Sequence, residues 1–245
     1  MIPDIEKRVI TYGLESGADV TARRLAFSGM SSRFEVMQRG RLLGPATLQV
    51  PGRHNVLNAL AAVAVGLDLE MPFPRIQSAL AGFAGVQRRF QIRGEARGVL
   101  VVDDYAHHPA EIRATLAAAK AGFDRRVITV FQPHRYTRSQ HLHREFLTAF
   151  YQSDVLIVMD IYAAGEAPIP GVHAREMAEG IAAHGHREVH YMDGDRQAII
   201  DYVTESTRSN DLVLTLGAGD VGHLGGEILQ RLGATGEPVN RRERC

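Results

Sequence analysis

From residue 87 onward, the hydrophobic positions alternate between short runs rich in β-branched residues and longer segments with apolar residues at helical spacing. The short runs predict strands, which we expect, after a two-stranded hairpin over 88–103, at 126–132, 154–160, 188–191 and 211–216. The longer segments predict helices at 109–122, 138–151, 173–183, 195–207 and 220–231. This alternation indicates an α/β fold with a mostly parallel sheet and helices on both faces.

The first 86 residues follow another pattern. Short β-rich segments between residues 8 and 50, separated by Gly and Ser turns, predict a run of antiparallel strands. Apolar residues then take up helical spacing from about His54 or Asn55 and again in PFPRIQSALAGFAG, so two helices are expected. We therefore place a domain boundary at residues 86/87. The charged, non-periodic residues 236–245 are expected to form a frayed tail.

Composition narrows the class of protein. The chain has 245 residues, of which 45% are hydrophobic and 23% charged, as in globular proteins of one large or two ordinary domains. Lys+Arg and Asp+Glu balance at 28 each, so neither nucleic acid nor a membrane surface is expected as a partner. No apolar run approaches the length of a membrane span, and the N-terminus has no secretory signal pattern. The single cysteine, Cys245, excludes an internal disulfide and a CxxC site, so a reducing, cytoplasmic setting is expected.

The segment GVLVVDDYAHHP, residues 98–109, predicts a buried strand that ends in polar residues and then turns into a helix. The polar group is Asp103, Asp104, Tyr105, His107 and His108, and Pro109 follows at the first helical turn. Ligands of open α/β sheets bind at the carboxyl ends of the strands, so this is the first candidate site. The alternative is that the aspartates cap the helix and the histidines are ordinary loop residues.

A second strand end lies in VITVFQPHRYTR, residues 127–138. Arg135 and Arg138 are three residues apart at the positive end of the next helix, with Gln132 and His134 beside them, which predicts a site for anionic groups. The alternative is that one arginine pairs with a local carboxylate. The Gly- and Pro-rich loop at residues 161–171 is either a structural turn or a mobile binding loop.

Two further motifs lie before the first of these strand ends. Asn55 and Asn58 share a helical face, where their amides could bind the edge of a heterocycle such as adenine; alternatively Asn55 is only the helix N-cap. Arg88 and Arg89, at the domain boundary, suit a phosphate or carboxylate clamp, or are merely exposed to solvent.

The run GAGDVG, residues 217–222, matches the dinucleotide-binding pattern GxGxxG. That fingerprint needs a second strand and an acidic residue within one βαβ unit, whereas only one helix and a tail are expected after it here. We therefore interpret the glycines as a tight turn that permits close backbone approach, and a nicotinamide-dependent oxidoreductase has only this motif in its favour. HExxH is absent, and His141 and His143 would face different sides of a helix, so no protein-only metal site is expected.

Taken in order, PGRHNVLNALAA, VQRRF, VDDYAHHPAEI, FQPHRYTR, IYAAGE and GAGD resemble the Mur ligase family, from about residue 8 to residue 232. The resemblance implies that residues 1–86 form part of the central ATP-binding domain and residues 87–235 a C-terminal Rossmann-like domain. It also implies residue roles. The residues implied to bind ATP are His54, Asn55, Asn58, Arg89 and Asp104, and those implied to bind substrate are Tyr105, His107, Arg135 and Arg138.

Within the family, the resemblance is to the ligases that join L-alanine to UDP-N-acetylmuramate, using ATP and Mg²⁺ and an acyl phosphate intermediate. The phosphate-binding pattern GxxxxGK[ST] is absent from the sequence, so we expect a C-terminal fragment with no ligase activity by itself. The alternatives are a non-catalytic nucleotide-binding module and a recycling ligase that adds a peptide to the muramoyl carboxylate. The sequence assigns neither catalytic residues nor an oligomeric state.

Overall fold

The computed structural model describes residues 6–15 and 17–234. The chain divides into two compact units, one of residues 1–85 with 121–123 and one of residues 86–120 with 124–245. The tail expected at 236–245, including Cys245, lies outside the described residues. None of the described helices is long and apolar enough to cross a membrane.

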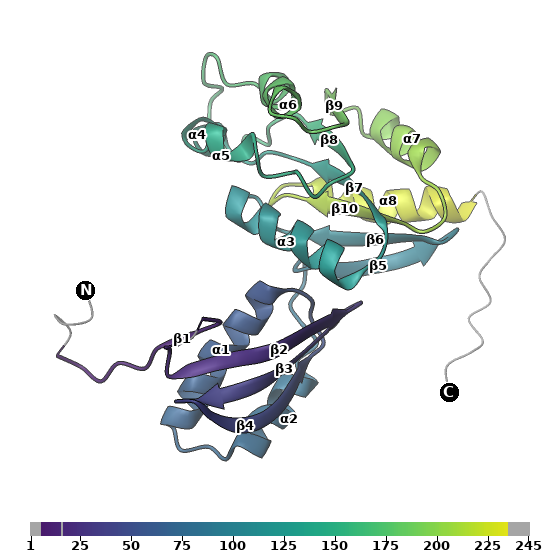
Figure 1. The fold of residues 1–245 in the computed structure, drawn as a ribbon. Helices are drawn as coiled ribbons and strands as arrows, with labels where there is room; N and C mark the ends of the chain where they lie inside the picture. The colour runs from purple at the N-terminus through teal and green to yellow at the C-terminus, as the bar shows by residue number, and fades with distance from the viewer. Residues whose placement is uncertain (1–5, 16, 235–245) are drawn as a thin grey trace. The chain divides into compact units, whose positions relative to one another are not determined.

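The second unit is built on a six-stranded sheet (Figure 1). Its strands are, in spatial order, β5 (Gln91–Ala96), β6 (Val99–Asp104), β10 (Asp211–Leu216), β7 (Arg126–Phe131), β8 (Val155–Met159) and β9 (Val189–Met192). All neighbours pair in parallel except β5, which forms an antiparallel hairpin with β6. The prediction of a mostly parallel sheet is confirmed.

Helices cover both faces of this sheet (Figure 1). They are α3 (Pro109–Gly122), α4 (Tyr136–His141), α5 (His143–Phe146), α6 (Ala174–Ala183), α7 (Arg196–Ser206) and α8 (Val221–Ala234). On one face, Ile199 of α7 and Leu224 of α8 share a buried core with Val101, Ile128 and Val213 of the strands. On the other face α5 and α6 pack together. Alternate strand residues supply the two cores because successive side chains of a strand point to opposite faces.

The prediction of a single helix over residues 138–151 is wrong. Two short helices, α4 and α5, take its place, with Leu142 between them in a non-helical conformation (φ −106°, ψ 18°). The break allows Phe146 and Phe150 to pack on Phe131 of β7, with ring centroids 5.7 and 5.0 Å apart. All three rings are buried, so tertiary packing outweighs the helical pattern here.

The first unit has a four-stranded sheet in the order β1 (Tyr12–Gly13), β2 (Val20–Ser28), β3 (Ser31–Gln38), β4 (Arg41–Leu48). Helices α1 (Arg53–Asp68) and α2 (Phe73–Gly82) bury Leu60 and Ile76 against strand residues such as Val36. β2, β3 and β4 are antiparallel as predicted. The prediction is wrong for β1, which pairs with β2 in parallel, because Asp19 accepts hydrogen bonds from the N–H and hydroxyl of Thr11 at 2.9 Å and holds the connecting loop.

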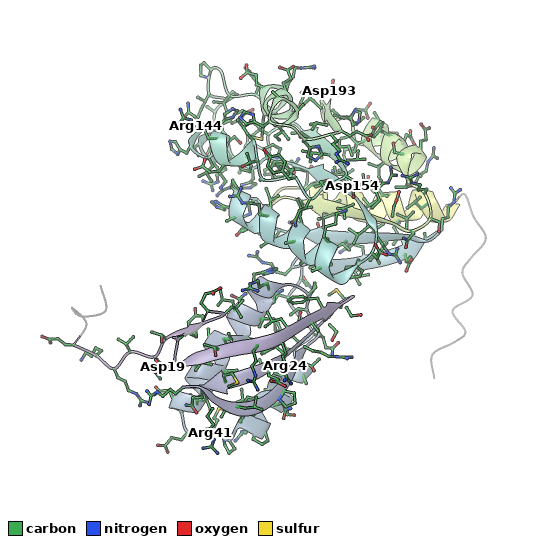
Figure 2. The ribbon with its side chains drawn as sticks, viewed as in Figure 1. Asp19, Arg24, Arg41, Arg144, Asp154 and Asp193 are labelled. Carbon is green, nitrogen blue, oxygen red and sulfur yellow. The ribbon has the colours of Figure 1, made fainter. Side chains whose placement is uncertain are left out.

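The two edges of the parallel sheet differ in chemistry. Asp154 directly precedes β8 and marks the edge where the parallel strands begin, whereas Asp193 directly follows β9 and marks the edge where they end (Figure 2). We call these the amino edge and the carboxyl edge. The motifs singled out in the second unit all lie in loops at the carboxyl edge.

Candidate active site

Loops from separate strands meet at the carboxyl edge and are joined by backbone hydrogen bonds. The Gly217 N–H, after β10, donates to the Asp104 carbonyl at the end of β6 at 3.2 Å. The Tyr162 N–H, after β8, donates to the Pro133 carbonyl, after β7, at 2.8 Å. Four segments that are far apart in the sequence therefore form one surface.

The adjacent arginines at the start of the unit have different surroundings. Arg88 Nε lies 3.0 Å from Oδ2 of Asp103, which is 1% exposed, and Arg88 Nη2 donates to the Gly217 carbonyl at 2.7 Å. Arg89 is exposed, and its guanidinium carbon lies 5.8 Å from the centre of the Tyr105 ring. Arg88 therefore ties the strands together, and Arg89 is the one exposed for a ligand.

Asp104, one of the residues implied to bind ATP, is 5% exposed. Its Oδ2 accepts the N–H of Phe90 at 2.7 Å and its Oδ1 that of Ala106 at 2.8 Å. Burial raises the pKa of Asp104 to about 6, although these two N–H groups and Arg89 oppose the shift. Each carboxylate oxygen has a further lone pair, so a ligand hydroxyl can still donate to it.

The aspartates do not cap the following helix, so that alternative is wrong. Glu111 Oε2 accepts the N–H groups of His107 at 3.0 Å and His108 at 3.2 Å, just before α3 begins at Pro109. This is the contact that a carboxylate in the first turn of a helix commonly makes with its leading amides. The same contact holds His107 in place.

Four rings form a continuous row along this edge, which we call the ring row: Tyr105, His107, His134 and Tyr162. Successive ring centroids are 5.1, 5.8 and 5.5 Å apart, and the last two rings are stacked at 11°. Burial lowers the pKa of both His107 and His134, and the cationic Arg138 adds to the effect at each. Both imidazoles are therefore neutral at pH 7.

The expected substrate arginines flank the ring row. Arg138 donates from Nη1 to the carbonyl of His134 at 3.0 Å and lies 3.1 Å from its Nδ1. Arg135 has a positive φ of 72°, which is uncommon for a residue with a side chain, and its N–H donates to the Tyr162 carbonyl at 2.8 Å. Its guanidinium lies 3.7 Å from Glu166, so the alternative of a local carboxylate partner holds for Arg135.

The loop at residues 161–171 was singled out from the sequence, but Glu166 within it was not. Glu166 accepts the N–H of Thr137 at 3.0 Å and its hydroxyl at 2.7 Å, and the hydrogen bond from the Thr137 N–H is the main reason that the pKa of Glu166 is lowered. The loop is thus fixed to the start of α4. A single acidic residue in a Gly- and Pro-rich loop after a strand is the signal that the sequence offered.

The GAGDVG segment provides the close approach that its glycines predict. Gly217 has φ +147°, and a Cβ there would lie 2.8 Å from the Gln132 carbonyl oxygen. Gln132 donates to Asp220 at 2.7 Å and accepts the Val221 N–H at 3.2 Å. In the described part of the chain α8 is the only element after β10, so the second strand of a nicotinamide-binding unit is not found there.

The expected adenine residues, His54, Asn55 and Asn58, lie in the first unit, in the first two turns of α1. Asn55 donates to the Pro51 carbonyl at 2.7 Å, and Asn58 lies 3.5 Å from Asn55 Oδ1. Gly52, with φ 98°, occupies the N-cap position, so the alternative that Asn55 is the cap is wrong. Both amides keep acceptor and donor capacity toward a ligand.

A complete set of magnesium ligands is not found among the residues that the structure describes. Within residues 6–15 and 17–234, no three His, Cys, Asp or Glu side chains are grouped closely enough to hold a metal ion. His141 and His143 belong to the separate helices α4 and α5.

Comparison with known proteins gives consistent matches. The model of the Mur ligase middle domain matches residues 2–66, and that of the Mur ligase glutamate ligase domain matches residues 88–219. A UDP-N-acetylmuramate–L-alanine ligase of Syntrophotalea carbinolica is 54% identical over 232 residues, which cover 95% of this chain and 50% of that protein. The chain thus spans about half the length of such relatives.

Solved structures agree on the fold. The UDP-N-acetylmuramate-alanine ligase of Thermotoga maritima is 27% identical with a TM-score of 0.76, over 93% of this chain and 48% of that one. The MurF ligase of Thermotoga maritima, solved with ADP, is 21% identical with a TM-score of 0.67, over 91% and 48%, and shows the fold alone. Since the glutamate ligase domain model matches more than half of the 245 residues, the chain belongs to the Mur ligase family.

Proposed function

We propose that this chain is the part of a UDP-N-acetylmuramate–L-alanine ligase that binds ATP and L-alanine and completes the amide-forming site. The reaction joins L-alanine to the muramoyl carboxylate through an acyl phosphate, a step of peptidoglycan precursor synthesis in the cytoplasm. In this proposal residues 1–86 belong to the central domain and residues 87–235 form the C-terminal domain. The names of the relatives, with 54% identity in one case, support the substrate assignment.

The observation that carries the proposal is the ring row with its arginines. Two neutral histidines lie 5.8 Å apart between centroids, and Arg138 contacts one of them at 3.1 Å. A carboxylate of the substrate can pair with a guanidinium while an amine is kept unprotonated beside a neutral imidazole. Amide formation between an amino acid and an activated carboxylate needs an unprotonated amine, and a guanidinium that holds the carboxylate keeps that amine in position.

Each unit contributes residues to nucleotide binding in this proposal. In the first unit, Asn55 and Asn58 bind adenine with His54 beside them. In the second, Arg89 meets the phosphates and Asp104 accepts the ribose hydroxyls. The exposed position of Arg89 and the remaining lone pairs of the Asp104 carboxylate support these roles. Tyr105, His107, Arg135 and Arg138 bind the amino acid and the muramoyl carboxylate.

The test is calorimetric titration of the folded chain with ADP. We expect binding that weakens about tenfold or more, a loss of about 1.4 kcal/mol, in Asn55→Ala and in Asp104→Ala. Gln77→Ala is the control for the first, because Gln77 also donates an amide hydrogen bond to a carbonyl, that of Pro45, at 2.7 Å.

Asp154→Ala is the control for the second variant. Asp154 also accepts a backbone N–H, that of Val127 at 2.7 Å, but lies at the amino edge (Figure 2). Both controls are expected to bind ADP as the unmodified chain does. Equal affinities in all four variants, or no binding by the folded chain, would contradict the nucleotide assignments.

A further inference from the structure

His107 and His134 are held in opposite tautomers. His107 Nδ1 lies 2.8 Å from the carbonyl oxygen of Tyr105. A carbonyl can only accept, so Nδ1 must carry the hydrogen, and Nε2 keeps a free lone pair. The unprotonated nitrogen of His107 is therefore Nε2.

The partner of His134 has the opposite requirement. Its Nδ1 lies 3.1 Å from Nη1 of Arg138. A guanidinium can only donate, so Nδ1 of His134 must accept, and the ring hydrogen is on Nε2. Arg138 Nη1 also donates to the His134 carbonyl at 3.0 Å, which fixes the guanidinium against this residue. His134 is thus a neutral donor.

The charged groups around the two rings also differ. A carboxylate lies near His107, whereas arginines lie near His134. Glu111 Oε2 lies 3.7 Å from Nδ1 of His107 and raises the pKa of that ring, although burial, Arg138 and His108 outweigh it. At His134, burial lowers the pKa, and Arg138, His107 and Arg135 lower it further, whereas Glu166 opposes the shift. An imidazolium formed at His107 therefore faces a carboxylate, 3.7 Å from its Nδ1.

We propose that His107 is the general base and His134 the neutral hydrogen-bond donor of the amide-forming step, an assignment that rests on the proposed function. The amine nitrogen of L-alanine forms a bond to the acyl carbon of the acyl phosphate. The bond from that carbon to the phosphate oxygen breaks, and inorganic phosphate leaves with the electron pair. The proton lost by the nitrogen passes to Nε2 of His107. The Nε2–H of His134 donates to the oxygen on which negative charge develops.

The environments follow a general rule for paired titratable groups. Where two similar groups lie in surroundings that favour opposite protonation states, their acid and base roles follow from those surroundings. The Tyr105 carbonyl orients His107 through Nδ1, and the Glu111 carboxylate 3.7 Å from the same nitrogen stabilises the imidazolium, as a carboxylate does in a recurring arrangement of histidine bases. A donor that stays neutral stabilises developing charge. Glu111 and Arg138 are the positioning residues in this assignment: Glu111 accepts the backbone N–H of His107, and Arg138 donates to Nδ1 of His134.

The experiment is ¹⁵N NMR of the histidine side chains in the whole chain without ligand, with signals assigned from His107→Gln and His134→Gln. At pH 7 we expect His107 as the Nδ1–H tautomer and His134 as the Nε2–H tautomer, both titrating below the ordinary pKa of 6.5. His184 is an internal reference, because its Nδ1 lies 2.8 Å from the Gly180 carbonyl and also requires the Nδ1–H form. Equal tautomers in His107 and His134, or the reverse pair, would overturn the proposal.

Two variants and one control test the causes. Arg138→Met is expected to release His134 into a mixture of tautomers with a higher pKa while His107 keeps Nδ1–H. Arg144→Met, an exposed arginine of α5, is expected to change neither ring (Figure 2). Glu111→Gln is expected to lower the pKa of His107 and leave His134 unchanged. An Arg138→Met spectrum identical to that of the unmodified chain would contradict the enforced tautomer.

The outcome is separable from that of the proposed function because no nucleotide or substrate is present in the spectra. If the chain shows the expected tautomers but fails to bind ADP, the proposed function is overturned. The two histidines then have no amide-forming reaction in which to act as base and donor. A reversed or mixed pair in a chain that binds ADP would overturn this inference and leave the proposed function standing.

Discussion

Neighbouring residues of the same type have unequal energetic roles in this chain, and Arg88 and Arg89 show it most directly. Asp103 is 1% exposed and Arg88 Nε lies 3.0 Å from it. Arg88→Ala would leave a buried carboxylate without its cation, and we expect a loss of about 3 kcal/mol of unfolding free energy. Urea unfolding at neutral pH, followed by circular dichroism, measures the loss.

Arg89→Ala is the matched control for this prediction. Its side chain is exposed and lies over the Tyr105 ring, so its removal should cost about 0.5 kcal/mol or less. Similar losses in both variants would show that Arg88 does not stabilise the strand ends in the way its contacts indicate.

Asp104 makes the stability of the chain depend on pH with a definite sign. Burial raises its pKa from 3.8 to about 6 in the folded chain, so between these values the folded state binds the proton more tightly than the unfolded one. Raising the pH from about 4 to about 7 therefore removes about 2 kcal/mol of stability through this group. The stability of Asp104→Asn relative to the unmodified chain should rise by that amount over the same range in urea titrations.

The stability of Asp154→Asn relative to the unmodified chain should fall as the pH rises, in the opposite direction to that of Asp104→Asn. Burial raises the pKa of Asp154, but Lys120 and the Val127 N–H outweigh it, so the pKa is lowered in the folded state. Its contribution is present at neutral pH and is lost in acid, and the unmodified chain should gain on Asp154→Asn as the pH rises. A difference between Asp104→Asn and the unmodified chain that stays constant with pH would exclude the raised pKa.

At the scale of elements, local sequence patterns were sufficient to predict strands and helices where burial and local propensity favour the same structure. The apolar runs at 99–102 and 212–214 form the buried strands β6 and β10, and the helix expected at 109–122 has those bounds. Packing overrode the pattern at Leu142, where the helical spacing continues but the chain bends so that Phe146 reaches Phe131. Local propensity is a weak guide where a tertiary contact of this kind competes with it.

The position of the candidate site at the carboxyl edge could be predicted, because local patterns locate the buried strands. The hydrogen-bond partners of the site residues could not be predicted. Polar residues directly after buried strands lead to one edge of a parallel sheet, which brings His107 near His134. The partners of these residues come from other loops, as Glu166 does for Thr137 and Asp220 for Gln132 across 88 positions. Such contacts depend on strand order, which a single sequence does not contain.

The chain holds two sets of proposed ligand contacts, but its sequence does not contain the phosphate-binding pattern of phosphoryl transfer. That step needs a cradle of backbone amides and a lysine around the phosphates, and GxxxxGK[ST] does not occur in the sequence. Of its two lysines, Lys7 and Lys120, the second is paired with Asp154 at 2.6 Å at the amino edge. Arginines alone position phosphates without completing the charge stabilisation.

We therefore expect this chain, mixed with ATP, Mg²⁺, UDP-N-acetylmuramate and L-alanine, to release ADP no faster than a mixture without protein. A coupled assay for ADP measures this, with calorimetric binding of ADP as the control that the chain is folded and competent. ADP binding without turnover would support the proposed nucleotide contacts. It would also show that phosphoryl transfer depends on residues other than those that give the affinity for ADP. Turnover dependent on L-alanine would mean that residues of this chain supply the charge stabilisation, and Arg89 would be the first to substitute.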